Sequence, residues 1–114
     1  DEVLRKLSRS LGAALRETDL PARLGGEEFA VLMPRTPTEH AVAVAERLRH
    51  TLEHTPVELD DGQTLGFTVS IGVSTWQPSD ANVDATLQRA DEALYRAKHG
   101  GRNRVEWAPV AAAE

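Results

Sequence analysis

The sequence alternates between segments with apolar residues at helical spacing and short apolar runs bounded by turn residues. In the first helical segment, Leu4, Leu7 and Leu11 recur every three or four residues. This spacing predicts a helix over residues 2–17 that ends before Pro21, because proline disfavours helical geometry in the residue before it. The pattern begins without a lead-in or an initiator methionine, so we expect the chain to be a piece of a longer protein.

Two further helices are predicted from their capping residues. Thr36 and Glu39 have the spacing of a capping box, and Pro37 occupies the first helical position, so the second helix is expected to begin here. Asn82 is expected to cap the third helix, which ends at Gly100-Gly101. The predicted apolar stripes are Ala41, Val44/Ala45, Leu48 and Leu52 in the second helix and Val83, Leu87, Ala90, Leu94 and Ala97 in the third.

The remaining apolar runs predict two hairpins and a short last strand, "RVEW". The first hairpin joins residues 22–24 to residues 28–34 through Gly25-Gly26. Its run "FAVLM" does not alternate, which is typical of a central strand buried on both faces. The second hairpin covers residues 57–76 and turns at Asp60-Asp61-Gly62. Gly72 in its second strand indicates the close approach of another backbone.

This order of elements, αββαββαβ, predicts a single α+β domain with a largely antiparallel sheet and flanking helices. The 114 residues suffice for one core, which we place in residues 1–107, and the alanine-rich residues 108–114 are expected to form a disordered tail.

Composition excludes several classes of protein. Apolar residues make up 40% and charged residues 27%, as in soluble globular domains, and the longest apolar run is too short to cross a membrane. The net charge of −5 disfavours binding to a nucleic acid polymer. With no cysteine, the chain has neither disulfides nor thiolate metal sites, which is compatible with the cytoplasmic location that we expect.

The stretch "RLGGEEF" at residues 23–29 raises a question that turn chemistry does not answer. Hairpin geometry alone explains Gly25 and Gly26. Glu27 and Glu28 are unusual, because a carboxylate at the mouth of a buried strand needs a cation, a hydrogen-bond donor or water. From these residues alone, the turn is either solvated or holds a metal or ligand.

Two distant signatures together resemble the GGDEF family. They are "RETDLPARLGGEEF" at 16–29 and "LQRADEALYRAKHGGRNRV" at 87–105, with "FTVSIGVS" between them. The family comprises diguanylate cyclases, which condense two GTP into cyclic di-GMP and release pyrophosphate. The resemblance implies a ferredoxin-like, nucleotidyl-cyclase-like sandwich that here lacks its opening strand and helix. Because the family carries a metal-binding Asp and a guanine-contacting Asn on those elements, residues 1–114 alone are expected to be inactive.

The resemblance also implies roles for residues of the active site. Glu27 is the expected catalytic metal ligand, and Mg²⁺ or Mn²⁺ the expected ion, since hard cations prefer oxygen ligands. Glu28 is a second candidate metal ligand, although strand alternation sends its side chain to the opposite face. The expected GTP contacts are Asp1 on the guanine edge, Gly25 and Gly26 through bare backbone, and Lys98 and Arg102 on the terminal phosphates.

Each of these assignments has a structural alternative. Lys98 and Arg102 are also suited to stabilise the C-terminus of a helix, and Asp1 is suited to the start of one. His50 and His54 are four residues apart and have the spacing to bridge a metal, but without a third ligand we interpret them as part of a solvated helix face.

A separate product site is implied by Arg16 and Asp19, which have the family's RxxD spacing, together with Arg47 on the exposed side of the second helix. The resemblance implies that cyclic di-GMP binds there and inhibits the enzyme. The expected partners are GTP, cyclic di-GMP, a second GGDEF domain in an antiparallel homodimer, and an upstream sensory domain. The main alternatives are a catalytically inactive domain that binds cyclic di-GMP or GTP, and a regulatory domain attached to a phosphodiesterase.

Overall fold

The computed structural model describes residues 2–25 and 28–109, and within residues 21–29 it describes only the backbone path. The elements in chain order are α1 (Glu2–Ala14), β1 (Leu20–Gly25), β2 (Glu28–Leu32), α2 (Thr38–Glu53), β3 (Val57–Glu58), β4 (Thr64–Leu65), β5 (Ile71–Val73), α3 (Val83–His99) and β6 (Val105–Trp107). Within these ranges, none of the helices combines the length and apolar character needed to cross a membrane.

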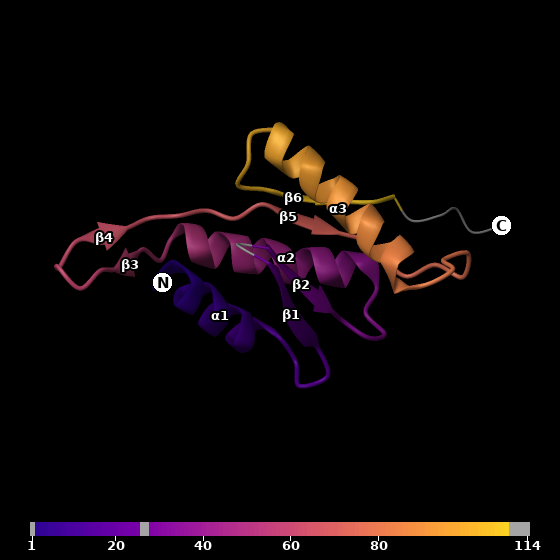
Figure 1. The fold of residues 1–114 in the computed structure, drawn as a ribbon, viewed down its shortest axis with the longest axis horizontal. Coiled ribbons are helices and arrows are strands. Elements are labelled where there is room, and N and C mark those ends of the chain that lie inside the picture. The colour runs from indigo at the N-terminus through magenta and orange to yellow at the C-terminus, as the bar shows by residue number, and fades with distance from the viewer. Residues whose placement is uncertain (1, 26–27, 110–114) are drawn as a thin grey trace.

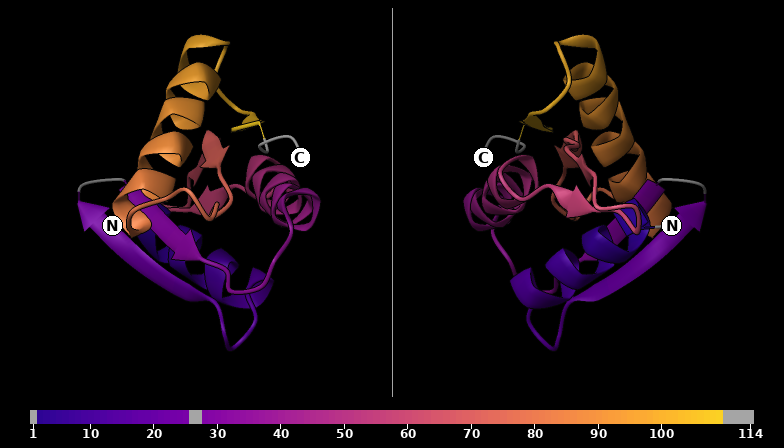
Figure 2. Two further views of the ribbon diagram at one scale, coloured as in Figure 1. Left: turned by 90° about the vertical axis from the view of Figure 1, so that its right-hand side faces the viewer. Right: turned by 90° about the vertical axis from the view of Figure 1, so that its left-hand side faces the viewer.

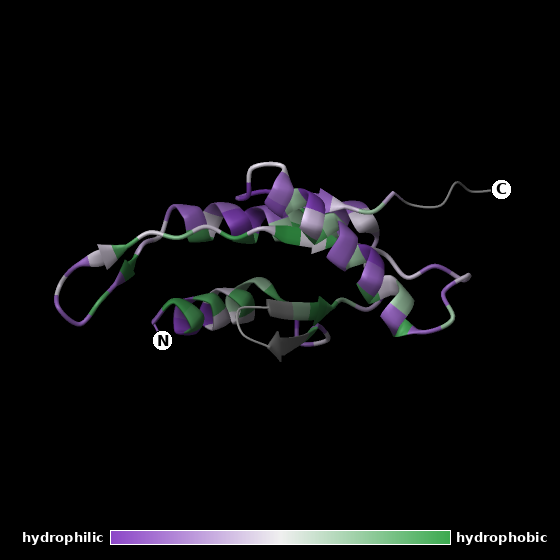
Figure 3. Cartoon of the chain, turned by 45° about the horizontal axis from the view of Figure 1, so that its top comes forward, coloured by the Kyte–Doolittle hydropathy of each residue, from purple (hydrophilic) through white to green (hydrophobic). Residues whose placement is uncertain are grey.

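The elements form two layers (Figures 1 and 3). Helix α1 and the β1–β2 hairpin make one layer, and α2, α3, β5 and β6 make the other. Figure 2 shows β5 between α2 and α3, and both helices also contact β6. The β3–β4 hairpin extends away from the rest of the molecule, with its base against α1. This arrangement confirms the α+β sandwich that the order of elements predicts.

Strands β5 and β6 pair in parallel, with Ile71 opposite Val105 and Val73 opposite Trp107. Parallel neighbours need a crossover connection, and α3 provides it. The second strand of the hairpin predicted over residues 57–76 is shorter than expected: residues 67–70 form no ladder among the described residues, and β5 begins only at Ile71. The predicted second hairpin is therefore two separate elements, the short antiparallel pair β3–β4 and the parallel strand β5.

The first hairpin is confirmed, with β1 and β2 antiparallel and Gly25 paired with Glu28. The prediction that "FAVLM" forms a strand buried on both faces is wrong at Leu32, which is 50% exposed and lies opposite Leu20, which is 58% exposed. The physical reason is that β2 pairs only with β1 within the described residues, so its end has no strand on its other side to cover it.

The start of α2 differs from the predicted capping box. Pro37 is the N-cap residue and provides no side-chain cap, and the helix begins at Thr38. The hydroxyl of Thr36 instead accepts a hydrogen bond from Arg16 and donates one to the Pro34 carbonyl. A tertiary contact has therefore replaced the expected local one.

The predicted ends of α3 are confirmed and that of α1 is not. The side chain of Asn82 accepts a hydrogen bond from the Ala85 amide at 3.2 Å, and Gly100 is the C-cap residue of α3. Helix α1 ends at Ala14 rather than Glu17, because the Asp19 carboxylate accepts the Arg16 amide and turns the chain.

The buried apolar residues come from α1, α2, β3, α3, β6 and Ala108, and on α3 they are alanines. Ala93 and Ala97 are fully buried, as is Leu52 of α2. The predicted stripe on α3 is wrong at its N-terminal end, where Val83 is 56% and Leu87 36% exposed, because the start of the helix lies beyond the short strands that the helix covers. Towards the C-terminus, Ala108 is buried and its amide donates to the Val73 carbonyl, whereas residues 110–114 of the expected tail lie outside the described residues.

The close approach predicted at Gly72 is confirmed. A Cβ on Gly72 would lie within 3.0 Å of backbone atoms of Ala90 and Leu94 in α3. Backbone atoms cannot rotate away as side-chain atoms do, so a side chain here would force the helix from the strand.

We predict that Gly72→Ala lowers the free energy of unfolding by about 1–3 kcal/mol, the usual cost of overpacking. Gly12→Ala is the matched control, because a Cβ at this position of α1 would have no neighbour within 4 Å. This control should raise stability by about 0.5–1 kcal/mol, since alanine favours helix over glycine. Urea unfolding of both variants checks the pair, and equal effects would contradict the proposed contact.

Candidate functional site

The C-terminal end of α3 carries two of the predicted phosphate contacts. Lys98 lies in the last turn and Arg102 three residues after the helix, and both side chains are exposed. The Arg102 amide donates to the Ala97 carbonyl at 2.9 Å, a bond that joins the first and last of six residues, as in a Schellman cap. Gly101, which follows the C-cap residue, has φ +123°, a value that favours glycine.

The backbone remains in the left-handed region after Gly101. Arg102 has φ 64° and Asn103 has φ 48°, so three successive residues have positive φ. The Arg104 guanidinium lies over this turn and donates to the Arg102 carbonyl at 3.4 Å. The turn over residues 101–103 is therefore a defined structure, and Arg102 projects from it.

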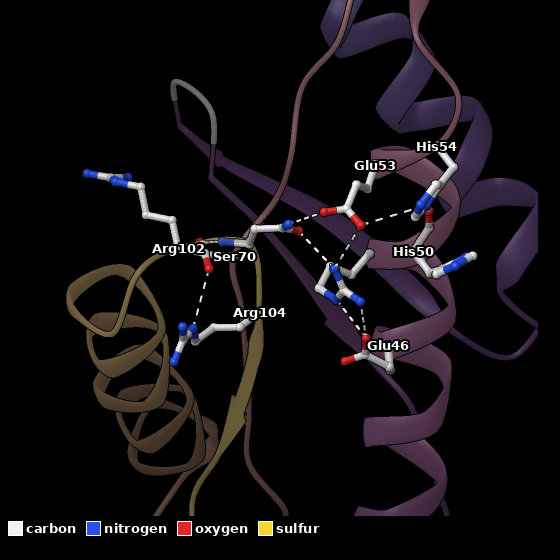
Figure 4. Close-up of polar contacts among 9 residues, drawn as sticks. Glu46, His50, Glu53, His54, Ser70, Arg102 and Arg104 are labelled. Carbon is white, nitrogen blue, oxygen red and sulfur yellow. Dashed lines mark hydrogen bonds and ion pairs between the residues drawn. The ribbon is translucent and has the colours of Figure 1, made fainter.

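A polar network joins this turn to α2 (Figure 4). Arg49 donates to the Asn103 side-chain oxygen at 2.9 Å, and the Asn103 amide nitrogen donates to Glu53. The Asn103 backbone amide donates to the hydroxyl of Ser70, just before β5. In Figure 4 the Arg102 side chain points away from Glu53. The network therefore holds the turn and leaves the Arg102 guanidinium available.

Charges within this network reinforce one another. The hydrogen bond from Asn103 is the main cause that lowers the pKa of Glu53, with Arg49 contributing its positive charge. The hydrogen bond to Glu46 is the main cause that raises the pKa of Arg49. Arg49 therefore stays protonated and Glu53 ionised across the physiological range. The sequence analysis missed this network, because its members come from two helices and a loop and share no motif.

The predicted product residues Arg16 and Asp19 are in direct contact. The Asp19 carboxylate is buried and accepts the Arg16 backbone amide at 2.9 Å and the Arg16 guanidinium at 3.4 Å. The backbone hydrogen bond is the main cause that lowers the pKa of Asp19. The Arg16 guanidinium also donates to Thr36 at 2.6 Å and to the Pro34 carbonyl at 3.3 Å.

The contacts of Arg16 give the RxxD spacing a structural role, because they join the end of α1 to the β2–α2 loop. The Arg16 side chain is nevertheless 52% exposed, so part of its guanidinium is open to a ligand. Arg47, the third predicted residue of the product site, is an exposed residue of α2.

The hairpin residues predicted at the reaction centre are only partly described. Gly25 and Glu28 lie at the facing ends of β1 and β2 and pair with each other. Asp1, Gly26 and Glu27 lie outside the described residues. The described part of the chain contains no group of three or more His, Asp or Glu placed to hold a metal ion.

The two histidines of α2 lie against each other on the helix surface. The rings of His50 and His54 stack with their centroids 4.2 Å apart. The His54 Nδ1 lies 2.8 Å from the His50 carbonyl oxygen, so this ring is engaged by its own helix.

A second ion pair that the sequence analysis missed holds α3 to the end of β5. Arg89 donates from both terminal nitrogens to Asp80, at 2.5 and 2.8 Å, and to the Thr75 carbonyl at 2.7 Å. Asp80 also accepts the Thr86 hydroxyl and the Gln77 amide. The bonds from Arg89 are the main cause that holds the pKa of Asp80 well below its ordinary value. The nine-residue separation of the two charges gave no signal in the sequence.

The fold is that of a nucleotidyl-cyclase-like domain. The chain belongs to the GGDEF family: the family described as "Diguanylate cyclase, GGDEF domain" matches residues 1–104. Among solved structures, it is similar to the GGDEF domain of DgcB from Caulobacter crescentus in complex with c-di-GMP, with a TM-score of 0.86 and 33% identity over 92% of this chain and 62% of that chain. It is also similar to the active GGEEF domain of a diguanylate cyclase from Vibrio cholerae, with a TM-score of 0.85 and 30% identity over 97% of this chain and 69% of that chain.

Curated relatives are similar over nearly all of the chain. The response regulator PleD of Caulobacter vibrioides is 44% identical over 106 residues, which are 92% of this chain and 23% of PleD. The diguanylate cyclase DgcM of Escherichia coli K12 is 44% identical over 105 residues, 92% of this chain and 24% of DgcM. The chain thus spans about a quarter of the length of these relatives. Diguanylate cyclases of this family depend on a metal ion.

The Asp80–Arg89 pair predicts a specific pH dependence of stability. Folding lowers the pKa of Asp80 from its ordinary value of 3.8, so the pair contributes fully to the free energy of unfolding at pH values above 3.8. This contribution is lost as the pH falls from 3.8 towards the lower pKa of the folded state. Asp80→Asn should therefore be less stable than the wild type at pH 7, and the difference should shrink below about pH 4.

Urea unfolding of the wild type and Asp80→Asn from pH 7 to pH 2 measures this difference. Asp60→Asn, at the exposed turn of the β3–β4 hairpin, controls for the removal of one negative charge. A wild-type advantage over Asp80→Asn that stays constant down to pH 2 would exclude the carboxylate as its source.

Proposed function

We propose that this chain is the C-terminal part of the catalytic domain of a diguanylate cyclase, which condenses two GTP into cyclic di-GMP and releases pyrophosphate. The observation that carries the proposal is the end of α3, where Lys98 and Arg102 are both exposed beside a turn fixed to α2. Two cations on a rigid support suit the terminal phosphates of a triphosphate. Family membership and the similarity to diguanylate cyclases support the same reaction.

In this proposal, Lys98 and Arg102 have complementary roles. Lysine is a compact point charge, and arginine presents a planar fork that matches two phosphate oxygens. Asp1 accepts from the guanine edge, whose donors adenine cannot match, and so favours GTP over ATP. Gly25 and Gly26 let the nucleotide lie against bare backbone.

The carboxylates of "GGEEF" are proposed to hold the metal. Glu27 is the main ligand for Mg²⁺ or Mn²⁺, Glu28 supports it, and the resemblance assigns further ligands to a segment before residue 1. An ion bound there would supply polarisation of the α-phosphate and a lower pKa of the attacking ribose hydroxyl. Each domain holds one GTP and supplies half of the product, so two domains act as an antiparallel pair.

Product inhibition is the second part of the proposal. Arg16, Asp19 and Arg47 offer arginine forks and a carboxylate to the guanine edges and phosphates of cyclic di-GMP. The 52% exposure of the Arg16 side chain supports this role, as does the complex of the related DgcB domain with c-di-GMP.

We predict that the full-length protein converts GTP into cyclic di-GMP in a metal-dependent way and that Glu27→Gln abolishes the conversion. Glutamine removes the charge at the metal while it keeps the volume, so folding and product binding should persist. Chromatographic separation of the nucleotides after incubation with GTP and Mg²⁺ or Mn²⁺ measures the outcome. Glu58→Gln in the β3–β4 hairpin is the matched control and should keep full activity.

Retained activity in Glu27→Gln would make Glu27 only a turn residue. Binding of cyclic di-GMP without any turnover by the wild type would instead favour the alternative function, a catalytically inactive domain that binds cyclic di-GMP or GTP.

The product site is tested best at Arg47, because Arg16 also holds the β2–α2 loop and its removal would disturb the fold. We predict that Arg47→Ala weakens cyclic di-GMP binding by about five-fold or more and leaves the initial rate of synthesis unchanged. Calorimetric titration with cyclic di-GMP and initial-rate assays measure the two quantities. Arg9→Ala, on the exposed side of α1, serves as the control, and equal affinities in both variants would remove Arg47 from the site.

A further inference from the structure

The turn that carries Arg102 has an unusual backbone for its sequence. Arg102 and Asn103 both have positive φ, a region that costs most side chains of order 1 kcal/mol per residue. Asparagine tolerates this region better than most residues. Such a conformation persists only where surrounding contacts determine it, so the contacts of Asn103 need an explanation.

Asn103 satisfies a combination of demands that few side chains meet. Its oxygen accepts from Arg49 at 2.9 Å, its side-chain nitrogen donates to Glu53, and its own backbone amide donates to Ser70. Aspartate at this position would still accept from Arg49 but would place a second negative charge against Glu53. Alanine would lose both contacts and leave half-buried charged groups of α2 without this partner.

The partner groups on α2 are themselves held in place. The Arg49 side chain is only 15% exposed, and it also donates to Glu46 at 2.7 Å and approaches Glu53 at 3.6 Å. Because these two carboxylates already hold the Arg49 guanidinium, the side chain loses little further conformational entropy when it binds Asn103. The link between α2 and the turn is therefore stiff. In Figure 4, Glu53 of α2 lies on the side of the turn opposite to the Arg102 side chain.

We propose that Asn103 is a positioning residue: by anchoring the turn over residues 101–103 to α2, it fixes the point from which Arg102 binds the terminal phosphates of GTP. This inference rests on the proposed function, which gives Arg102 that ligand. A charged fork held in advance loses less entropy on binding than one on a mobile loop. Asn103 therefore contributes to triphosphate affinity without contacting the ligand.

The test compares two nucleotides that differ only beyond the α-phosphate. One is guanosine 5′-(α,β-methylene)triphosphate, whose α–β bridge the reaction does not break, and the other is GMP. Affinities of the full-length protein for both are measured by calorimetry in the presence of Mg²⁺. Asn103→Ala should weaken triphosphate binding by roughly 3- to 30-fold and leave GMP binding within about two-fold of the wild type.

Three further variants separate positioning from a general effect on folding. Asn103→Gly keeps the freedom of φ but loses the link to α2, so it should also weaken triphosphate binding. Arg102→Ala should weaken it at least as much, and the double variant of Arg102→Ala with Asn103→Ala should bind no more weakly than Arg102→Ala alone. Asn82→Ala removes an asparagine cap at the other end of α3 and should leave the ratio of the two affinities unchanged.

The outcomes distinguish this inference from the proposed function. If Arg102→Ala weakens triphosphate binding while both Asn103 variants bind like the wild type, positioning is wrong and the phosphate role of Arg102 stands. Equal losses for the triphosphate and GMP in Asn103→Ala would mean general support of the fold, which also overturns the inference. If Arg102→Ala has no effect, the proposed phosphate contact fails and the inference fails with it.

Discussion

The contact between α3 and β5 at Gly72 sets the position of the whole C-terminal half of the chain. With no side chain at Gly72 and only alanines at the buried positions 93 and 97, the helix axis lies close to the strand. The parallel pairing of β5 with β6 then fixes where the chain must return after the helix. Strands β5 and β6 fix both ends of the connection that contains α3, so the turn after the helix has little freedom. The backbone that carries Lys98 and Arg102 is therefore held in a defined position.

Two ion-pair networks maintain this arrangement at the opposite ends of α3. The Asp80–Arg89 pair holds the N-terminal half to the end of β5, and the Arg49–Asn103 network holds the turn beyond the C-terminus to α2. In both networks the charged groups bind partners within the protein. Lys98 and Arg102 belong to neither network and are exposed cations at the end of α3. A domain with a net charge of −5 can therefore still present a local positive site to a triphosphate, since recognition depends on nearby charges more than on the total.

Features that depend on local chemistry could be predicted from the sequence, and features that depend on distant partners could not. The cap of α3 by Asn82 could be predicted because its partner, the Ala85 amide, lies only three residues further along the chain. The close approach of a backbone at Gly72 could be predicted because glycine has no side chain. Thr36 has the local sequence signal of a helix cap. In the structure its hydroxyl instead accepts a hydrogen bond from the Arg16 guanidinium, 20 residues earlier in the chain. For the same reason, the family resemblance supplied the proposed role of Arg102, whereas the network that holds its turn became visible only in three dimensions.

The β3–β4 hairpin has a different relation to the rest of the fold. It extends from the body of a molecule with extents of 57 × 32 × 24 Å, and each of its strands contributes only two residues to the ladder (Figure 1). Val57 anchors its base in the core, while the turn at residues 60–62 is exposed. Backbone amides near that turn are thus expected to exchange with solvent through local opening that leaves α2 and α3 intact. Evolution can accordingly lengthen or replace this tip at little thermodynamic cost, which makes it the part of the domain best suited to diverge between relatives.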